Sequence, residues 1–248
     1  MALYRDEGIV LRTIRLGEAD RIVTLATPGH GKVRAVAKGV RRTKSRIGSR
    51  LEPLNHVSML CWSGRELDII NQVETVHSNR RLREDFDRLM PAMTMLEILD
   101  HVAVEQHAMS ELFTMTVGAL TTLATSDSSL VLAGFCWRLL AIEGVAPVVD
   151  SCTRCGDDGQ LVAFDGDEGG FLCRNCRRGQ AVAPETVVLV QRILGGELRG
   201  VLAEGPHRVD ADVEQLAVRA VERHLDRRLR TTRHLPDGAA AAPTTPGA

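Results

Sequence analysis

Alternation of apolar and polar residues dominates the first 76 positions and predicts β-strands. In one such run, Val33, Ala35 and Ala37 would face a core, and the intervening, partly basic residues would face solvent. Runs of this kind cover residues 3–16, 21–25, 33–38, 54–62 and 67–76. Five short strands without helices between them are typical of a small barrel such as an OB-fold, and an SH3-like barrel would have a similar pattern.

From residue 78 onward the apolar residues recur every three or four positions and predict helices. Pro91 would end a first short helix, Ser110 and Ser128 are candidate N-caps, and Pro184 would begin a later helix. The predicted helices cover 80–90, 92–106, 110–124 and 128–143, with two more beginning at Pro184 and near Asp210. The 248 residues therefore predict an α+β protein, with a small barrel of the OB-fold or SH3-like type at 1–78, a helical domain at 79–235 and a disordered tail at 236–248.

Two CxxC pairs interrupt the helical part of the chain. Cys152 and Cys155 are separated by 17 residues from Cys173 and Cys176, and the glycines between them suit a hairpin. This spacing is typical of a four-thiolate zinc ribbon or knuckle, here at residues 150–178. Four cysteines leave no coordination position for water, so the pattern predicts one structural zinc ion per chain. The alternative is four reduced or disulfide-bonded cysteines.

Charge is distributed unevenly along the chain. Residues 1–60 carry a net charge of +7, which leaves −8 for the remainder. Residues 32–50 contain eight basic and no acidic side chains, and such a segment favours a polyanion over a merely solubilising surface. The candidate nucleic-acid contacts are Lys32, Arg34, Lys38, Arg41, Arg42, Lys44 and Arg46.

Aromatic residues are scarce in the predicted barrel, which offers only Tyr4 and Trp62. Proteins that hold single strands usually stack bases on aromatic side chains, and the apolar neighbours of Trp62 predict that it lies in the core. We therefore expect binding through the phosphate backbone, with little sequence preference and a strong dependence on salt.

Motifs for catalysis are missing from the sequence. It contains no Walker loop, nucleophile elbow, HExxH or nucleotide fingerprint, so we expect no enzymatic activity. Glu97, His101 and Glu105 recur every four residues and could be metal ligands or acid and base, but one helix alone does not enclose an ion, which favours a solvated face. A solvated face, and not a second nucleic-acid contact, is also favoured for the arginines of the last predicted helix, Arg219, Arg223, Arg227 and Arg230. The remaining two cysteines, Cys61 and Cys136, have apolar neighbours and are expected in the core.

The sequence shows neither a signal peptide nor a membrane-spanning run. Charged residues occupy the N-terminal positions where a signal peptide would need an apolar stretch. The longest uncharged run, 112–126, is shorter than the roughly 20 residues that span a bilayer. We expect a cytoplasmic, nucleoid-associated protein without a membrane partner.

Several N-terminal strings resemble a known family. Four segments are similar to the start of proteins of the bacterial RecO family, which mediates recombination in DNA repair. They are Asp6-Glu7-Gly8-Ile9-Val10-Leu11, residues 16–23, His30-Gly31-Lys32-Val33 and residues 37–42. The resemblance continues through the helices to the CxxC pairs and covers about residues 1–235.

This resemblance implies an OB-fold packed on a helical domain with an inserted zinc knuckle. It also implies binding of single- and double-stranded DNA, annealing of complementary strands, and action with RecR and the single-strand-binding protein that helps RecA recombinase load at gaps, without a small-molecule substrate. Carried over to this chain, Lys32, Arg34, Lys38, Arg41, Arg42 and Lys44 would contact phosphate, and Cys152, Cys155, Cys173 and Cys176 would hold zinc.

Two other classes of protein share part of the pattern. A zinc-ribbon transcription or RNA-binding factor would have the same basic barrel and cysteines, but it should prefer a defined sequence or an RNA fold. A nuclease would need a carboxylate cluster for magnesium. The acids of the barrel show no such arrangement: Asp6, Glu7, Glu18, Asp20 and Glu52.

Overall fold

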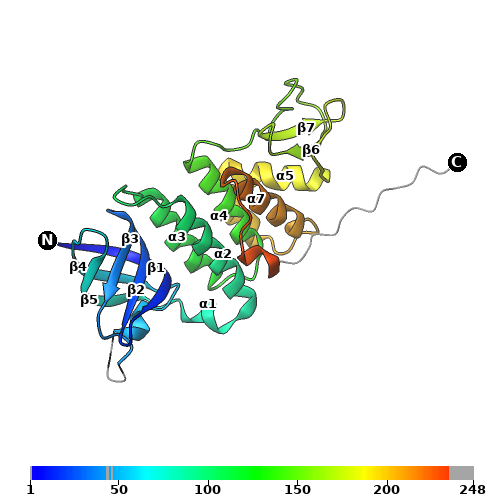
Figure 1. Ribbon diagram of the computed structural model, residues 1–248. Coiled ribbons are helices and arrows are strands. Elements are labelled where there is room, and N and C mark those ends of the chain that lie inside the picture. The colour runs from blue at the N-terminus through cyan, green and yellow to red at the C-terminus, as the bar shows by residue number, and fades with distance from the viewer. Residues whose placement is uncertain (1, 43–44, 46, 235–248) are drawn as a thin grey trace. The chain divides into compact units, whose positions relative to one another are not determined.

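The computed structural model describes residues 2–42, 45 and 47–234. Within this part the chain forms two compact units, coloured in Figure 1 by residue number. The first unit comprises residues 2–127 with Leu229–Thr231, and the second comprises Ser128–Arg228 with residues 232–234. No helix in these described ranges has the length and apolar character needed to cross a bilayer. The tail predicted at 236–248 lies outside the described residues.

A closed barrel forms the N-terminal part of the first unit. Its strands are β1 (Leu3–Leu16), β2 (Asp20–Thr27), β3 (Gly31–Ala37), β4 (His56–Trp62) and β5 (Asp68–His77). They follow the order β1-β2-β3-β5-β4, and β4 pairs with β1 to close the sheet. Only the pairing of β3 with β5 is parallel among these five strands. This arrangement confirms the predicted five-stranded OB-fold barrel.

Alternation along the strands determines which side chains fill the barrel. Val33, Ala35 and Ala37 are buried in its core, and so is Cys61, as predicted. The prediction for Trp62 is wrong. Because successive side chains of a strand point to opposite faces, the inward position of Cys61 turns Trp62 outward, where it is 39% exposed.

Helices complete the first unit. They are α1 (Arg80–Glu84), α2 (Phe86–Val102) and α3 (Ser110–Leu123), with the short 3-10 helix η1 (Gly48–Leu51) after the basic segment. The predicted break at Pro91 is wrong, because Pro91 lies inside α2 and removes only a hydrogen bond to the carbonyl of the exposed Asp87. The break lies instead at Asp85, whose backbone is extended and whose carboxylate accepts a hydrogen bond from the N–H of Asp87.

The turn between β2 and β3 attaches the barrel to the segment that links α2 and α3. The N–H of Lys32 donates to the carbonyl of Val104 (3.1 Å), and the N–H of Gln106 donates to the carbonyl of His30 (2.9 Å). Gly31 has a φ of +66°, and a Cβ there would lie 2.1 Å from the Val104 oxygen. Glycine is therefore required where the two segments meet.

Packing also decides where the units divide. The change from strands to helices predicts a domain boundary at residue 78, and this stays a prediction; by contacts, the compact units divide after Asp127. The reason is that α2 packs against β1 and α3 packs against β2. Ser110 is the first residue of α3, and its hydroxyl donates to the carbonyl of Pro28 (3.3 Å) instead of capping the helix.

The second unit combines helices with a small sheet. Its helices are α4 (Leu130–Ile142), α5 (Pro184–Arg192), α6 (Leu198–Ala203) and α7 (Asp210–His224), and its strands are β6 (Leu161–Asp165), β7 (Gly170–Cys173) and β8 (Gln180–Ala181). The predicted start of α5 at Pro184 is confirmed, and Ser128 Oγ accepts from the N–H of Leu130 at the start of α4. Trp137 of α4 is fully buried and contacts Phe164, which in turn contacts Phe171, so aromatic rings join the sheet to the helices.

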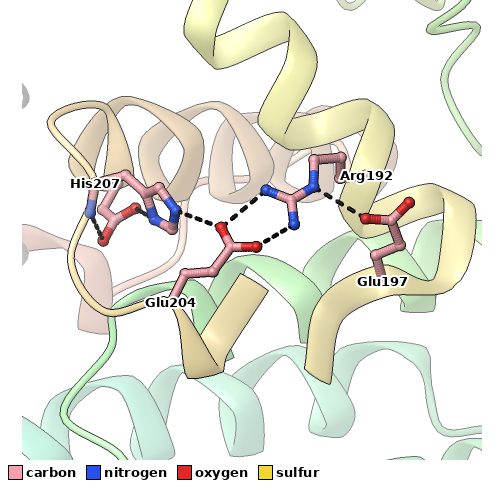
Figure 2. Close-up of polar contacts among 5 residues, drawn as sticks. Arg192, Glu197, Glu204 and His207 are labelled. Atoms are coloured by element: carbon pink, nitrogen blue, oxygen red, sulfur yellow. Dashed lines mark hydrogen bonds and ion pairs between the residues drawn. The ribbon is translucent and has the colours of Figure 1, made fainter. Parts of the chain in front are cut away.

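A chain of ion pairs holds the junction of α5, α6 and α7 (Figure 2). Arg192 donates to Glu197 (3.0 Å) and to both carboxylate oxygens of Glu204, and Glu204 also contacts His207 (3.2 Å). Hydrogen bonds from Arg192 and then His207 lower the pKa of Glu204 to about 2. The chain between α5 and α6 is the π-helical turn η2 (Ile193–Glu197), and Gly196 within it has a φ of +94°. These contacts therefore hold an irregular connection in one conformation.

Candidate metal centre and nucleic-acid interface

Four cysteine side chains meet in the second unit. The sulfur atoms of Cys152, Cys155, Cys173 and Cys176 all lie within 4.8 Å of one another, and those of Cys155 and Cys173 are 3.7 Å apart. Tetrahedral zinc with Zn–S bonds of about 2.3 Å separates neighbouring sulfurs by about 3.8 Å. None of the four forms a disulfide. The structure therefore brings the predicted ligands together in an arrangement that fits a metal ion.

Local backbone contacts position these thiols. The N–H of Cys152 donates to the carbonyl of Asp157 (2.8 Å), and the N–H of Gly156 donates back to the carbonyl of Cys152 (2.8 Å), which folds the first CxxC turn. The second pair begins at Cys173, the last residue of β7, and the N–H of Cys176 donates to the carbonyl of Cys173 (3.2 Å). The antiparallel strands β6 and β7 form the hairpin that the glycines predicted between the two pairs.

The thiols influence one another electrostatically. Burial raises the pKa of Cys152, but backbone hydrogen bonds, foremost that of Cys173, outweigh it and lower this pKa to about 6. A side-chain hydrogen bond with Cys155, followed by burial, raises the pKa of Cys176 to about 12. Cys152 therefore loses its proton readily, whereas ionisation of Cys176 is disfavoured. A bound cation would allow all four thiols to ionise together.

Arginines of α7 contact the knuckle, defined here as residues 150–178 with the following strand β8. Arg223 pairs with Asp167 in the turn between β6 and β7, and Arg219 donates to the side chain of Gln180 (2.8 Å). Both arginines remain exposed. The helix face that we expected to be only solvated thus also holds the knuckle.

Exposed basic side chains lie in β3 and in the turn that follows it in the first unit. Arg34, Lys38, Arg41 and Arg42, which we call the basic group, are all exposed. Within the described residues none of the four forms an ion pair, although Arg41 donates to the carbonyl of Gly17 (3.1 Å). Their charges are therefore available to an external anion. Lys44 and Arg46, the other predicted contacts beyond β3, lie outside the described residues.

Lys32 has a different environment from the basic group. Its ammonium lies 3.3 Å from a carboxylate oxygen of Asp100 in α2, and Arg12 Nε lies 2.8 Å from the other oxygen. Burial raises the pKa of Asp100, but Arg12 and Lys32 outweigh that effect and lower it. Lys32 therefore links β3 to α2, a role that the run of basic residues in the sequence did not reveal.

Glu97, His101 and Glu105 do not form a shared site. α2 ends at Val102, before Glu105. Glu97 accepts hydrogen bonds from the N–H of Arg230 (2.9 Å) and from the N–H and hydroxyl of Thr231 (3.0 and 2.8 Å). The solvated face predicted for Glu97 is therefore wrong, because its carboxylate holds a returning segment of the chain. In the part of the chain that the structure describes, the four cysteines are the only cluster suited to a metal.

Comparisons with known proteins cover both parts of the chain. Residues 1–79 match the family described as Recombination protein O N terminal, and residues 83–233 match Recombination protein O C terminal. A protein named DNA repair protein RecO from Thermobifida fusca (strain YX) is 41% identical over 239 residues, which are 94% of this chain and 98% of the relative. Another of that name from Nocardioides sp. (strain ATCC BAA-499 / JS614) is 46% identical over 204 residues, which are 79% of this chain and 84% of the relative. The chain therefore belongs to the RecO family.

Proposed function

We propose that this protein is a recombination mediator of DNA repair that binds single- and double-stranded DNA and anneals complementary strands without catalysing a reaction. The observation that carries this proposal is the basic group of β3 and the following turn, exposed and without ion pairs among the described residues of a RecO-family barrel. The names of its relatives, DNA repair protein RecO, support the same process.

Annealing requires little beyond electrostatics. Two strands repel each other through their phosphates, and side chains such as Arg34 and Arg41 would neutralise that charge and release condensed counterions. Contacts to phosphate carry no sequence information, so any two complementary strands would be accepted. Base pairing itself then supplies the free energy that completes the duplex.

Protein partners extend this proposal. On the basis of family membership, we infer that the protein acts with RecR and with the single-strand-binding protein, and that together they help RecA recombinase load on coated gaps.

Zinc is the metal that best fits the four thiols. Cysteine thiolates are its usual ligands in structural sites, and the 3.7 Å between the sulfurs of Cys155 and Cys173 matches tetrahedral coordination. The ion would supply a cross-link between the two CxxC turns. In this proposal the side chains of the chain hold the ion, and no reaction passes through it.

Annealing of two complementary oligonucleotides, one labelled with a fluorophore and the other with a quencher, tests the proposed function. We expect the protein to accelerate quenching without nucleotide or divalent metal, and added salt to slow the reaction. Tight binding without acceleration would contradict the proposal and would favour a sequence-reading or RNA-binding factor.

Changing Arg34, Lys38, Arg41 and Arg42 together to alanine should weaken binding to all DNA sequences alike. At about 0.7 units per single-strand phosphate contact, the slope of log affinity against log salt should flatten by roughly three units. A matched control changes four exposed arginines elsewhere, Arg81, Arg138, Arg199 and Arg208, and removes the same charge. Equal losses in both variants would mean that only net charge matters, and the basic group would not be the contact site.

A further inference from the structure

The turn that follows β3 carries three of the four residues of the basic group, and it lies against a second turn of the barrel. The first turn covers residues 38–42, and the second covers residues 17–19, between β1 and β2. The last paired residues of β2 and β3 at this end are Arg21 and Ala37. Both turns therefore leave the sheet at the same end of the barrel.

Three hydrogen bonds join the two turns. The carboxylate of Asp20, the first residue of β2, accepts from the N–H of Gly39 (2.7 Å). The carbonyl of Ala19 accepts from the N–H of Arg41 (2.9 Å), and the carbonyl of Gly17 accepts from the guanidinium of Arg41 (3.1 Å). All three acceptors belong to the connection of β1 to β2, and all three donors belong to the turn that carries the basic side chains.

The same basic turn is also fixed by packing and by its own backbone. Val40 lies in the barrel core, and its carbonyl oxygen would be 2.8 Å from a Cβ at Gly48. Gly39 has a φ of +65°, which favours glycine, and its carbonyl accepts from the N–H of Arg42 (3.2 Å). The backbone that carries Arg41 and Arg42 is therefore held in place while their side chains remain exposed.

Asp20 differs from the other two acceptors because its contact is made by a side chain. Its carboxylate is partly buried and forms no ion pair with a described residue. A hydrogen bond from a backbone N–H to a carboxylate is shorter and stronger than one between neutral groups. Among the three contacts between the turns, this one can be removed by substitution without changing the backbone acceptors.

The charge of Asp20 and its hydrogen bond act on DNA binding in opposite directions. A carboxylate close to a phosphate-binding surface repels the phosphates, so its charge alone weakens binding. A turn that is already ordered loses less conformational freedom when it binds, so the hydrogen bond strengthens binding. Any benefit that Asp20 brings to DNA binding must therefore come from its geometry.

We propose that Asp20 is a positioning residue for the proposed DNA binding. Its hydrogen bond to Gly39 holds the turn in the conformation in which Arg41 and Arg42 present their guanidinium groups to phosphates. This inference rests on the proposed function and adds to it a residue that does not itself contact the nucleic acid.

Two substitutions with the same charge separate geometry from electrostatics. Asp20→Asn keeps an acceptor oxygen and should bind an oligothymidylate at least as tightly as the unchanged protein. Asp20→Ala loses the acceptor and should bind roughly 3- to 10-fold more weakly than Asp20→Asn. If the contact of Arg41 with a phosphate is lost, the slope of log affinity against log salt should flatten by about 0.7 units in Asp20→Ala but not in Asp20→Asn.

Glu18 provides a matched control in the same connection. It is exposed, and its side chain makes no hydrogen bond or ion pair with the residues that the structure describes. Glu18→Gln and Glu18→Ala should therefore bind the oligothymidylate with equal affinity. Urea denaturation of all variants would establish that binding is compared between folded proteins.

A second comparison tests whether Asp20 acts through the arginines. The difference in affinity between Asp20→Ala and Asp20→Asn should disappear when Arg41 and Arg42 are both changed to alanine. A role in general stability would leave this difference in place. Should Asp20→Ala fail to fold, Asp20→Glu keeps the original charge but moves the acceptor by one methylene group, and it should bind more weakly than the unchanged protein.

The outcomes separate this inference from the proposed function. Equal affinities of Asp20→Ala and Asp20→Asn would overturn the inference and leave the proposed function in place, as would a difference that persists without the two arginines. If only Asp20→Glu can be measured, an unchanged affinity would have the same meaning. Failure of the unchanged protein to bind any DNA would overturn the proposed function itself.

Discussion

The Cys173→Ser protein is expected to contain no zinc and to lose the folded knuckle while its barrel remains folded. Serine is a poor zinc ligand, and three thiolates leave the coordination of a structural site incomplete. Apparent binding free energies of structural zinc in finger peptides are about 10–16 kcal/mol at neutral pH, far more than the few buried side chains of the knuckle could replace. Those side chains are mainly Phe164, Phe171 and Leu172.

Elemental analysis and amide hydrogen exchange would measure this effect. We expect one zinc per unchanged chain, none in Cys173→Ser, and faster exchange in residues 150–181 but not in β1 to β5. Cys136→Ala is the matched control, because it removes a buried thiol of α4 that is not part of the cluster. One zinc per chain in Cys173→Ser would show that the ligand assignment is wrong.

Changing Glu214 to glutamine is expected to stabilise the protein at pH 8 and to have little effect near pH 4.5. Burial, followed by the charge of Asp210, raises the pKa of Glu214 in α7 to about 7, although a hydrogen bond with Ser129 acts in the opposite direction. Because the folded pKa exceeds the value of 4.5 for an unperturbed glutamate, the charged form is disfavoured in the fold. The unchanged protein should therefore lose stability as the pH rises from about 4.5 to about 7.

Glutamine keeps the shape of Glu214 and removes its charge. The expected gain in free energy of unfolding at pH 8 is at most about 3 kcal/mol, from a pKa difference of about 2.5 units at 1.36 kcal/mol each. Urea denaturation at pH 5 and pH 8 would measure it. Glu185→Gln, which alters an exposed carboxylate of α5, should have a similar small effect at both values. If Glu214→Gln changed the free energy of unfolding equally at pH 5 and pH 8, the raised pKa of Glu214 would be contradicted.

Local patterns in the sequence predicted much of the architecture. The five strands were visible because side chains alternate along a strand that has one face in a core, as Val33, Ala35 and Ala37 do. The cysteine cluster was visible because a CxxC turn brings two thiols to one ion wherever the turn occurs. Family membership was visible in the N-terminal strings, of which Gly31 proves to be required where the turn meets the linker between α2 and α3.

Individual side-chain roles depended on residues far away in the chain. Lys32 belongs to the basic run by composition, but its partner Asp100 is 68 residues away, and only the packing of α2 on the barrel brings the two together. From the sequence, Glu97 was expected to be solvated. In the structure its carboxylate accepts hydrogen bonds from the N–H groups of Arg230 and Thr231, which are 133 and 134 residues away in the chain.

What the sequence determined by itself was most of the strands and helices and the cluster of four cysteines, since both depend on spacings of a few residues along the chain. The tertiary structure decided which charges are paired and which apolar residues are covered. Trp62 illustrates the difference, because its apolar neighbours in sequence suggested a core position. Its outward orientation and its place beside Ile69 follow from strand register, and register is a property of the assembled sheet.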